Sequence, residues 1–138
     1  MNIFIGTNVL LDVLAKREPH YMAAAQLWTF SETGKHHGHI SVISFNNIFY
    51  IVRKLSGRRA AQQALAILRD VFEPVTLDSQ VLNQAISAGF ADFEDAIQYH
   101  SALRADAKCL ITRNVGHFPK SAIPVMTPVE FLAAYPNV

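Results

Sequence analysis

The chain has 138 residues, of which 51% are apolar and 17% are charged, and its formal net charge is +1. This length and composition predict one folded domain spanning residues 1–138 and exclude a disordered chain. The apolar runs are far shorter than the roughly 20 residues that span a bilayer, and no signal peptide is visible, so we expect a cytoplasmic protein. The single cysteine, Cys109, excludes an internal disulfide and is expected to be a buried structural thiol.

Strand-like and helix-like patterns alternate along the first half of the chain. One short apolar strand precedes Thr7 and another precedes Ser44, and each of these hydroxyl residues is expected to cap the helix that follows it. Gly34 is expected to end a helix. The predicted strands span residues 2–5 and 39–42, and the predicted helices run from residue 7 toward the break at Glu18-Pro19, from 21 to 33, from 44 to 57 and from 58 to 72.

The second half of the chain continues this alternation. Asp78 and Asp92 each stand before a helical pattern, and Pro128 occupies the first position of the last helix, where proline is favoured. Gly89 is expected to close the helix that Asp78 caps. The predicted strands span residues 75–77, 109–112 and 124–126, and the predicted helices span 79–88, 92–107 and the segment that follows Thr127.

Short apolar strands separated by helices predict an α/β domain with a mainly parallel sheet. Ligands of such sheets bind beyond the carboxyl ends of the strands. The candidate site therefore consists of the polar positions that follow the strands, together with the acidic start of one helix. These positions are Gly6, Thr7, Asn8, Ser44, Asn46, Asn47, Arg113, Asn114 and His117, with Asp92, Glu94 and Asp95.

Three of the eleven Asp and Glu residues, Asp92, Glu94 and Asp95, fall within four positions. Carboxylate and amide oxygens are the ligands that Mg²⁺ and Mn²⁺ prefer, and two such ions can activate water for phosphodiester hydrolysis. A helix N-cap followed by acidic residues in the first turn explains the same cluster without a metal. Both interpretations remain open at this point.

Two further groups of residues bear on possible partners. Basic residues within seven positions could contact phosphates, although cations near a helix C-terminus are also favoured without a ligand; they are Arg53, Lys54, Arg58 and Arg59. The chain also has bulky apolar residues that a small core does not need in full, and any left exposed would indicate a protein-binding surface. These residues are Tyr21, Trp28, Phe30, Phe45, Phe49 and Tyr50.

The order of these motifs resembles that of PIN-domain proteins along essentially the whole chain. Residues 3–12 resemble the family's opening, which is an apolar strand, then Asp-Thr-Asn, then an apolar helix. Residues 44–50 resemble the second motif, 92–98 match the third and 110–118 resemble the fourth. The tail at 123–132 is similar to the end of many such chains.

This resemblance implies a three-layer α/β/α sandwich with a mainly parallel sheet of about five strands. It also implies a Mg²⁺- or Mn²⁺-dependent endoribonuclease of the VapC-like toxin type, a homodimer that a small antitoxin holds inactive. The implied metal positions are Asp95, Asp92 and Gly6, and the implied catalytic positions are Asp95, Asp92, Glu94, Asn114, Asn47, Thr7 and Asn8. RNA contacts are expected from Arg113 and from Arg53, Lys54, Arg58 and Arg59.

The departures from the family pattern are chemically specific. Gly6 stands where the family has its first metal-binding Asp, Asn47 stands where Glu is common, and Asn114 and His117 stand where acidic residues are frequent. Because losing even a supporting partner costs a metal site about 10–100-fold, we predict weak metal binding and an impaired ribonuclease.

Alternatives remain at this stage. The chain could be a catalytically dead PIN-fold module that binds RNA or protein, and Gly6 could be natural or an inactivating substitution. A flavodoxin-like domain is disfavoured because the sequence has no Gly-rich phosphate loop.

Overall fold

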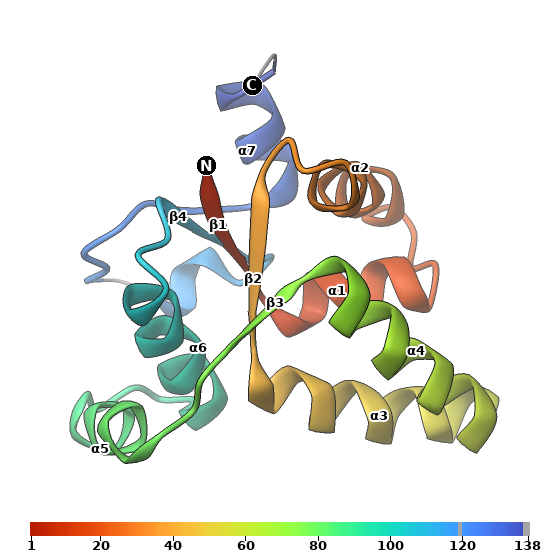
Figure 1. Cartoon of the computed structure of the whole chain (residues 1–138). Coiled ribbons are helices and arrows are strands. Elements are labelled where there is room, and N and C mark those ends of the chain that lie inside the picture. Colours follow the sequence, from red (N-terminus) through yellow and green to blue (C-terminus); the bar gives the residue numbers. More distant parts are fainter. Residues whose placement is uncertain (119, 137–138) are drawn as a thin grey trace.

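The computed structural model describes residues 1–118 and 120–136. Within these residues, five parallel strands form one sheet in the order β3-β2-β1-β4-β5 (Figure 1). The strands are β1 (Asn2–Ile5), β2 (His37–Ser41), β3 (Glu73–Val75), β4 (Cys109–Ile111) and β5 (Val125–Met126). The helices are α1 (Thr7–Leu14), α2 (Tyr21–Glu32), α3 (Val42–Ser56), α4 (Arg58–Val71), α5 (Ser79–Ser87), α6 (Phe93–Arg104) and α7 (Pro128–Ala134), and a 3₁₀ turn, η1, spans Val115–His117.

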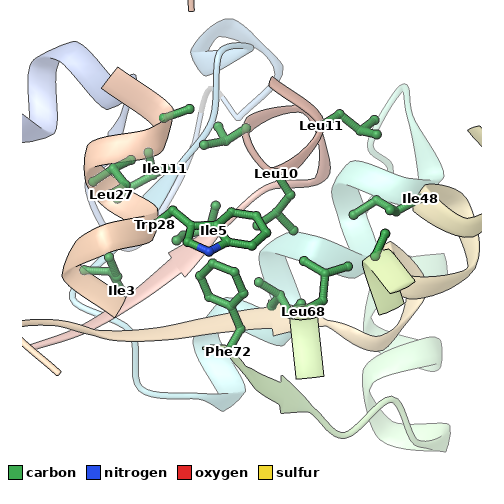
Figure 2. Close-up of a cluster of buried hydrophobic side chains, with 14 of the residues drawn as sticks. Ile3, Ile5, Leu10, Leu11, Leu27, Trp28, Ile48, Leu68, Phe72 and Ile111 are labelled. Atoms are coloured by element: carbon green, nitrogen blue, oxygen red, sulfur yellow. The ribbon is translucent and has the colours of Figure 1, made fainter. Parts of the chain in front are cut away.

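The predicted α/β/α sandwich with a parallel sheet is confirmed. Alternate residues of β1 face opposite ways, as the two-residue period of a strand requires. Ile3 and Ile5 pack into a core that contains residues of α1, α2, α3 and α4 (Figure 2). Phe4 packs on the other side with Tyr99 of α6 and Leu110 of β4. Figure 1 shows α5 and α6 on one side of the sheet, and α1, α2 and α4 on the other.

Two of the predicted helix starts are displaced. Gly6 is the N-cap of α1, so Thr7 is the first helical residue instead of the cap. Ser41 caps α3, where its side chain accepts a hydrogen bond from the Ile43 N–H, and Ser44 lies inside the first turn. Both hydroxyl groups are thereby released from capping, and both turn toward the candidate site.

The other predicted starts are confirmed. Asp78 and Asp92 cap α5 and α6, and each accepts the N–H of the residue three positions later, Val81 and Asp95. Thr127 caps α7 in a reciprocal capping box with Glu130. Because Asp92 is a working cap, it positions the two acidic residues that follow it in the first turn of α6.

The burial of Cys109 and the lengths of the helices agree with expectation. Cys109 is 1% exposed, and its burial raises the pKa of the thiol to about 11, so it is an inert core residue. Across residues 1–118 and 120–136, no helix has the length and apolar character that crossing a membrane would require.

Candidate functional site

A polar pocket lies at the carboxyl edge of the sheet, where β1, β2 and β4 end. Its volume is about 540 Å³, and residues that follow these three strands line it together with the start of α6. The predicted positions that line the pocket are Thr7, Asn8, Asn46, Asn47, Asp92, Glu94, Asp95, Asn114 and His117. The structure therefore brings together nine of the twelve candidate positions, whereas Gly6, Ser44 and Arg113 do not line the pocket.

A buried hydrogen-bond network holds one wall of this pocket. Thr7 Oγ1 lies 2.7 Å from Ser44 Oγ and donates to Glu94 Oε2 at 2.9 Å. Gln98 Nε2 donates to the same Glu94 oxygen at 3.0 Å and also lies 3.2 Å from Thr7 Oγ1. The network thus links the first turns of α1 and α3 to α6.

Gln98 is the residue of this network to which the sequence analysis gave no role. It is 5% exposed, and it lies one helical turn after Glu94, with buried apolar residues on either side of it. A polar residue at a position where the helix is otherwise buried is a signal that could have identified it, because buried polar groups need partners.

Asp95 and His117 form a pair on the opposite side of the acidic cluster. His117 Nδ1 lies 2.8 Å from Asp95 Oδ2, and the aspartate side chain is 16% exposed. Burial is the main cause that raises the pKa of Asp95; the hydrogen bond from His117 opposes it, and the charges of Asp92 and Glu94 add to it.

Four of the other residues that line the pocket are asparagines. Asn46, Asn47 and Asn114 line the pocket. Asn8 Oδ1 is buried and has no hydrogen-bond partner among the described residues, which makes it a polar atom ready to meet a ligand or water.

Gly6 leaves only a narrow gap at the N-terminus of α1. Its φ of −74° and ψ of 158° suit any L-residue, so the glycine is not required by the backbone. An ideal Cβ built there would lie 3.1 Å from Gln98 Oε1 and 3.3 Å from the Ile111 carbonyl oxygen. The side chain of Gln98 therefore closes the space into which a residue at position 6 would project.

The predicted RNA-binding cations lie outside the pocket. Arg113 forms two hydrogen bonds to Asp12, from Nε at 2.7 Å and from Nη2 at 3.2 Å, and the Asp12 side chain is fully buried. The other four cations are exposed at the end of α3 and the start of α4; they are Arg53, Lys54, Arg58 and Arg59. Lys54 Nζ lies 5.5 Å from the ring centre of Tyr50, which lines the pocket, so the basic group begins at the pocket rim.

The donor set does not fit the divalent cation that the resemblance implied. Asp95 Oδ2 accepts from His117, one oxygen of Glu94 accepts from Thr7 and Gln98, and Asp92 accepts the capping N–H. Position 6 supplies no oxygen. Over the described chain, no three His, Cys, Asp or Glu side chains converge as a metal site would need.

The model of the PIN domain matches residues 2–116 of this chain. Because this match covers most of its length, the chain belongs to the PIN-domain family. A comparison with curated protein sequences gave no match.

Solved structures with the same fold include bacterial toxin–antitoxin proteins. VapBC-1 from nontypeable Haemophilus influenzae matches at 15% identity with a TM-score of 0.71, over 94% of this chain and 99% of that chain. A toxin–antitoxin complex from Klebsiella pneumoniae matches at 23% identity and a TM-score of 0.67, over 91% of this chain and 97% of that chain. The Mycobacterium tuberculosis toxin VapC20, which cleaves the sarcin–ricin loop, matches at 20% identity and a TM-score of 0.61, over 78% of this chain and 86% of that chain. The fold of this chain is thus that of VapC-type structures.

The pairing of Arg113 with Asp12 predicts a large stability effect. Replacing Arg113 by Met leaves a fully buried carboxylate without its cation, which should lower the free energy of unfolding by about 3 kcal/mol. Urea denaturation measures this, and the double variant Asp12→Asn/Arg113→Met should recover part of the loss. An Arg113→Met protein as stable as the parent would show that the ion pair does not stabilise the fold.

The geometry at Gly6 predicts that an aspartate is tolerated there. The backbone already has N-cap geometry, and Gln98 Oε1 and the Ile111 carbonyl oxygen each need to shift by only a few tenths of an ångström. Gly6→Asp should therefore change the free energy of unfolding by less than about 1 kcal/mol, as should the control Gly6→Ala. Thermal unfolding of both variants checks this, and a much larger loss in Gly6→Asp alone would mean that the pocket cannot accept a carboxylate.

Proposed function

We propose that this chain is a VapC-like ribonuclease of the toxin type, with a pocket that is catalytically impaired because Gly6 supplies no carboxylate. The observation that carries the proposal is the strand-end pocket, in which the Thr7–Glu94–Gln98 network and Asp95 are assembled next to the gap at position 6. Family membership and the likeness to VapC-type structures support the same class.

The roles follow from the place of each residue. Asp95 and Asp92 are the carboxylates expected to meet the Mg²⁺ or Mn²⁺ that PIN nucleases generally use, and Glu94 supports them. Thr7, Asn8, Asn47 and Asn114 would orient water or RNA oxygens. Because the residues present do not complete a metal site, binding of Mg²⁺ or Mn²⁺ to this chain should be weak.

RNA is the proposed substrate or ligand. The exposed cations at the α3–α4 junction lie on the helix whose first half lines the pocket, so one RNA strand could touch both regions. Guanidinium groups pair well with phosphate oxygens. Arg113 is engaged with Asp12, and any phosphate contact it makes would be additional to that pair. The likeness of this chain to VapC20, a toxin that cleaves the sarcin–ricin loop, supports the proposal.

An antitoxin and a second copy of the chain are the proposed protein partners. Several apolar side chains remain exposed on α3, α4 and α5, namely Tyr50, Leu55, Ile67, Leu82 and Ile86, with exposed fractions of 41% to 65%. Tyr50 is one of the bulky residues whose exposure was expected to mark such a surface, whereas Trp28 is buried in the core. Exposed apolar groups of this kind are typical of protein interfaces.

The second candidate function is a PIN-fold module that binds RNA or protein without cleaving it. The observation that favours it is the internal pairing of the acidic residues, since Glu94 and Asp95 already have protein partners. The two functions predict different results for a variant with carboxylates at positions 6 and 117. A ribonuclease would then cut RNA, whereas a binding module would not.

The distinguishing experiment uses labelled single-stranded RNA with the parent chain and with Gly6→Asp/His117→Asp, which places acids at both altered positions. Both proteins should bind RNA in fluorescence anisotropy, with an affinity that falls as salt rises. In Mn²⁺ the double variant should cleave at least about 100-fold faster than the parent. Adding Asp95→Asn to the double variant is the matched control and should abolish the gain.

Each outcome has a defined meaning. RNA that is bound but left intact by the double variant would replace the ribonuclease proposal by the binding-only function. Absence of RNA binding in both proteins would remove RNA from either proposal.

A further inference from the structure

His117 occupies a position in the pocket that the proposed function leaves without a role. It belongs to η1, where its backbone N–H donates to the Asn114 carbonyl oxygen at 3.0 Å. The next residue, Phe118, is 5% exposed and packs against Phe90 with ring centres 5.9 Å apart. The turn is therefore anchored on both sides, and the hydrogen bond to Asp95 holds the imidazole, which is 54% exposed.

The Asp95–His117 contact uses a carboxylate oxygen that a cation would need. The Nδ1–H of His117 is the donor in this 2.8 Å contact, since the carboxylate oxygen can only accept. Such a contact between an imidazole and a carboxylate is charge-assisted and stronger than a neutral one. Three acidic side chains crowded in one turn repel one another, and the histidine relieves this repulsion at Asp95 without any bound ion.

The other side of the pocket is satisfied in a similar way. Glu94 accepts two donors, and the amide of Gln98 is oriented so that its Nε2 points to Glu94 while its Oε1 lies against the gap at Gly6. An aspartate at position 6 would meet this amide oxygen first. Gly6, which has no side chain, and His117, which binds Asp95, thus both reduce the oxygens that the pocket offers to a cation.

We infer that His117 takes the place of a divalent cation at Asp95, so that positions 6 and 117 are coupled and a carboxylate at position 6 alone does not restore cation binding. The inference concerns the same pocket as the proposed function, and it rests on the proposed function in that respect alone. His117 blocks the cation through its contact with Asp95. Cation binding therefore requires both a carboxylate at position 6 and removal of the histidine.

The experiment is a calorimetric titration of Mn²⁺ into four proteins: the parent, Gly6→Asp, His117→Ala and the double variant Gly6→Asp/His117→Ala. We expect no measurable heat for the parent or for His117→Ala. The double variant should bind at least about 10-fold more tightly than Gly6→Asp, because removing the histidine frees the Asp95 oxygen without adding a ligand. Paramagnetic broadening of the Asp95 backbone amide signal should locate the ion in the pocket.

A matched control separates this effect from the loss of any histidine. His37 is exposed on β2 and does not line the pocket, so Gly6→Asp/His37→Ala should bind Mn²⁺ as Gly6→Asp does. Tight binding by the parent, equal affinities of Gly6→Asp and the double variant, or no binding by any of the four proteins would overturn the inference. Since no RNA is used, failure of the ribonuclease proposal leaves this result unaffected.

Discussion

The hydrogen bond from Thr7 to Glu94, at 2.9 Å, is the contact on which the architecture of the pocket depends. It joins the start of α1 to the first turn of α6, and the 2.7 Å contact between Thr7 and Ser44 adds α3 to the same cluster. These three helices follow or face the ends of parallel strands, where backbone and side-chain polar groups gather. Because Thr7 and Ser44 do not cap their helices, their hydroxyl groups are available to bind one another and Glu94.

The fold of the pocket and its proposed chemistry depend on different features of the same residues. The helices and strands need only a satisfied set of buried polar groups, and Gln98 and Thr7 provide this for Glu94 within the protein. A nuclease needs carboxylate oxygens that remain available to an ion. In this chain Asp95 is instead bound to His117, and position 6 has no side-chain oxygen; the proposed impairment rests on these two features.

Much of the fold could be predicted from local sequence signals, whereas the contacts within the site could not. Asp78 and Asp92 were identified as caps because a helix N-terminus is recognised by a few adjacent residues. The starts at Thr7 and Ser44 were displaced because Gly6 and Ser41 occupy the capping positions, which only the backbone path decides. His117 lies 22 positions from Asp95, Thr7 lies 87 from Glu94 and Asp12 lies 101 from Arg113, and tertiary packing alone brings such residues together.

The most direct test of this account is anomalous diffraction from crystals soaked in Mn²⁺. The account predicts no anomalous peak beside Asp95 in this chain, and an imidazole of His117 that stays within hydrogen-bonding distance of the carboxylate. A strong peak bonded to Asp95 in the unaltered chain, with His117 displaced, would contradict it. That result would mean that the pocket binds a cation without a carboxylate at position 6.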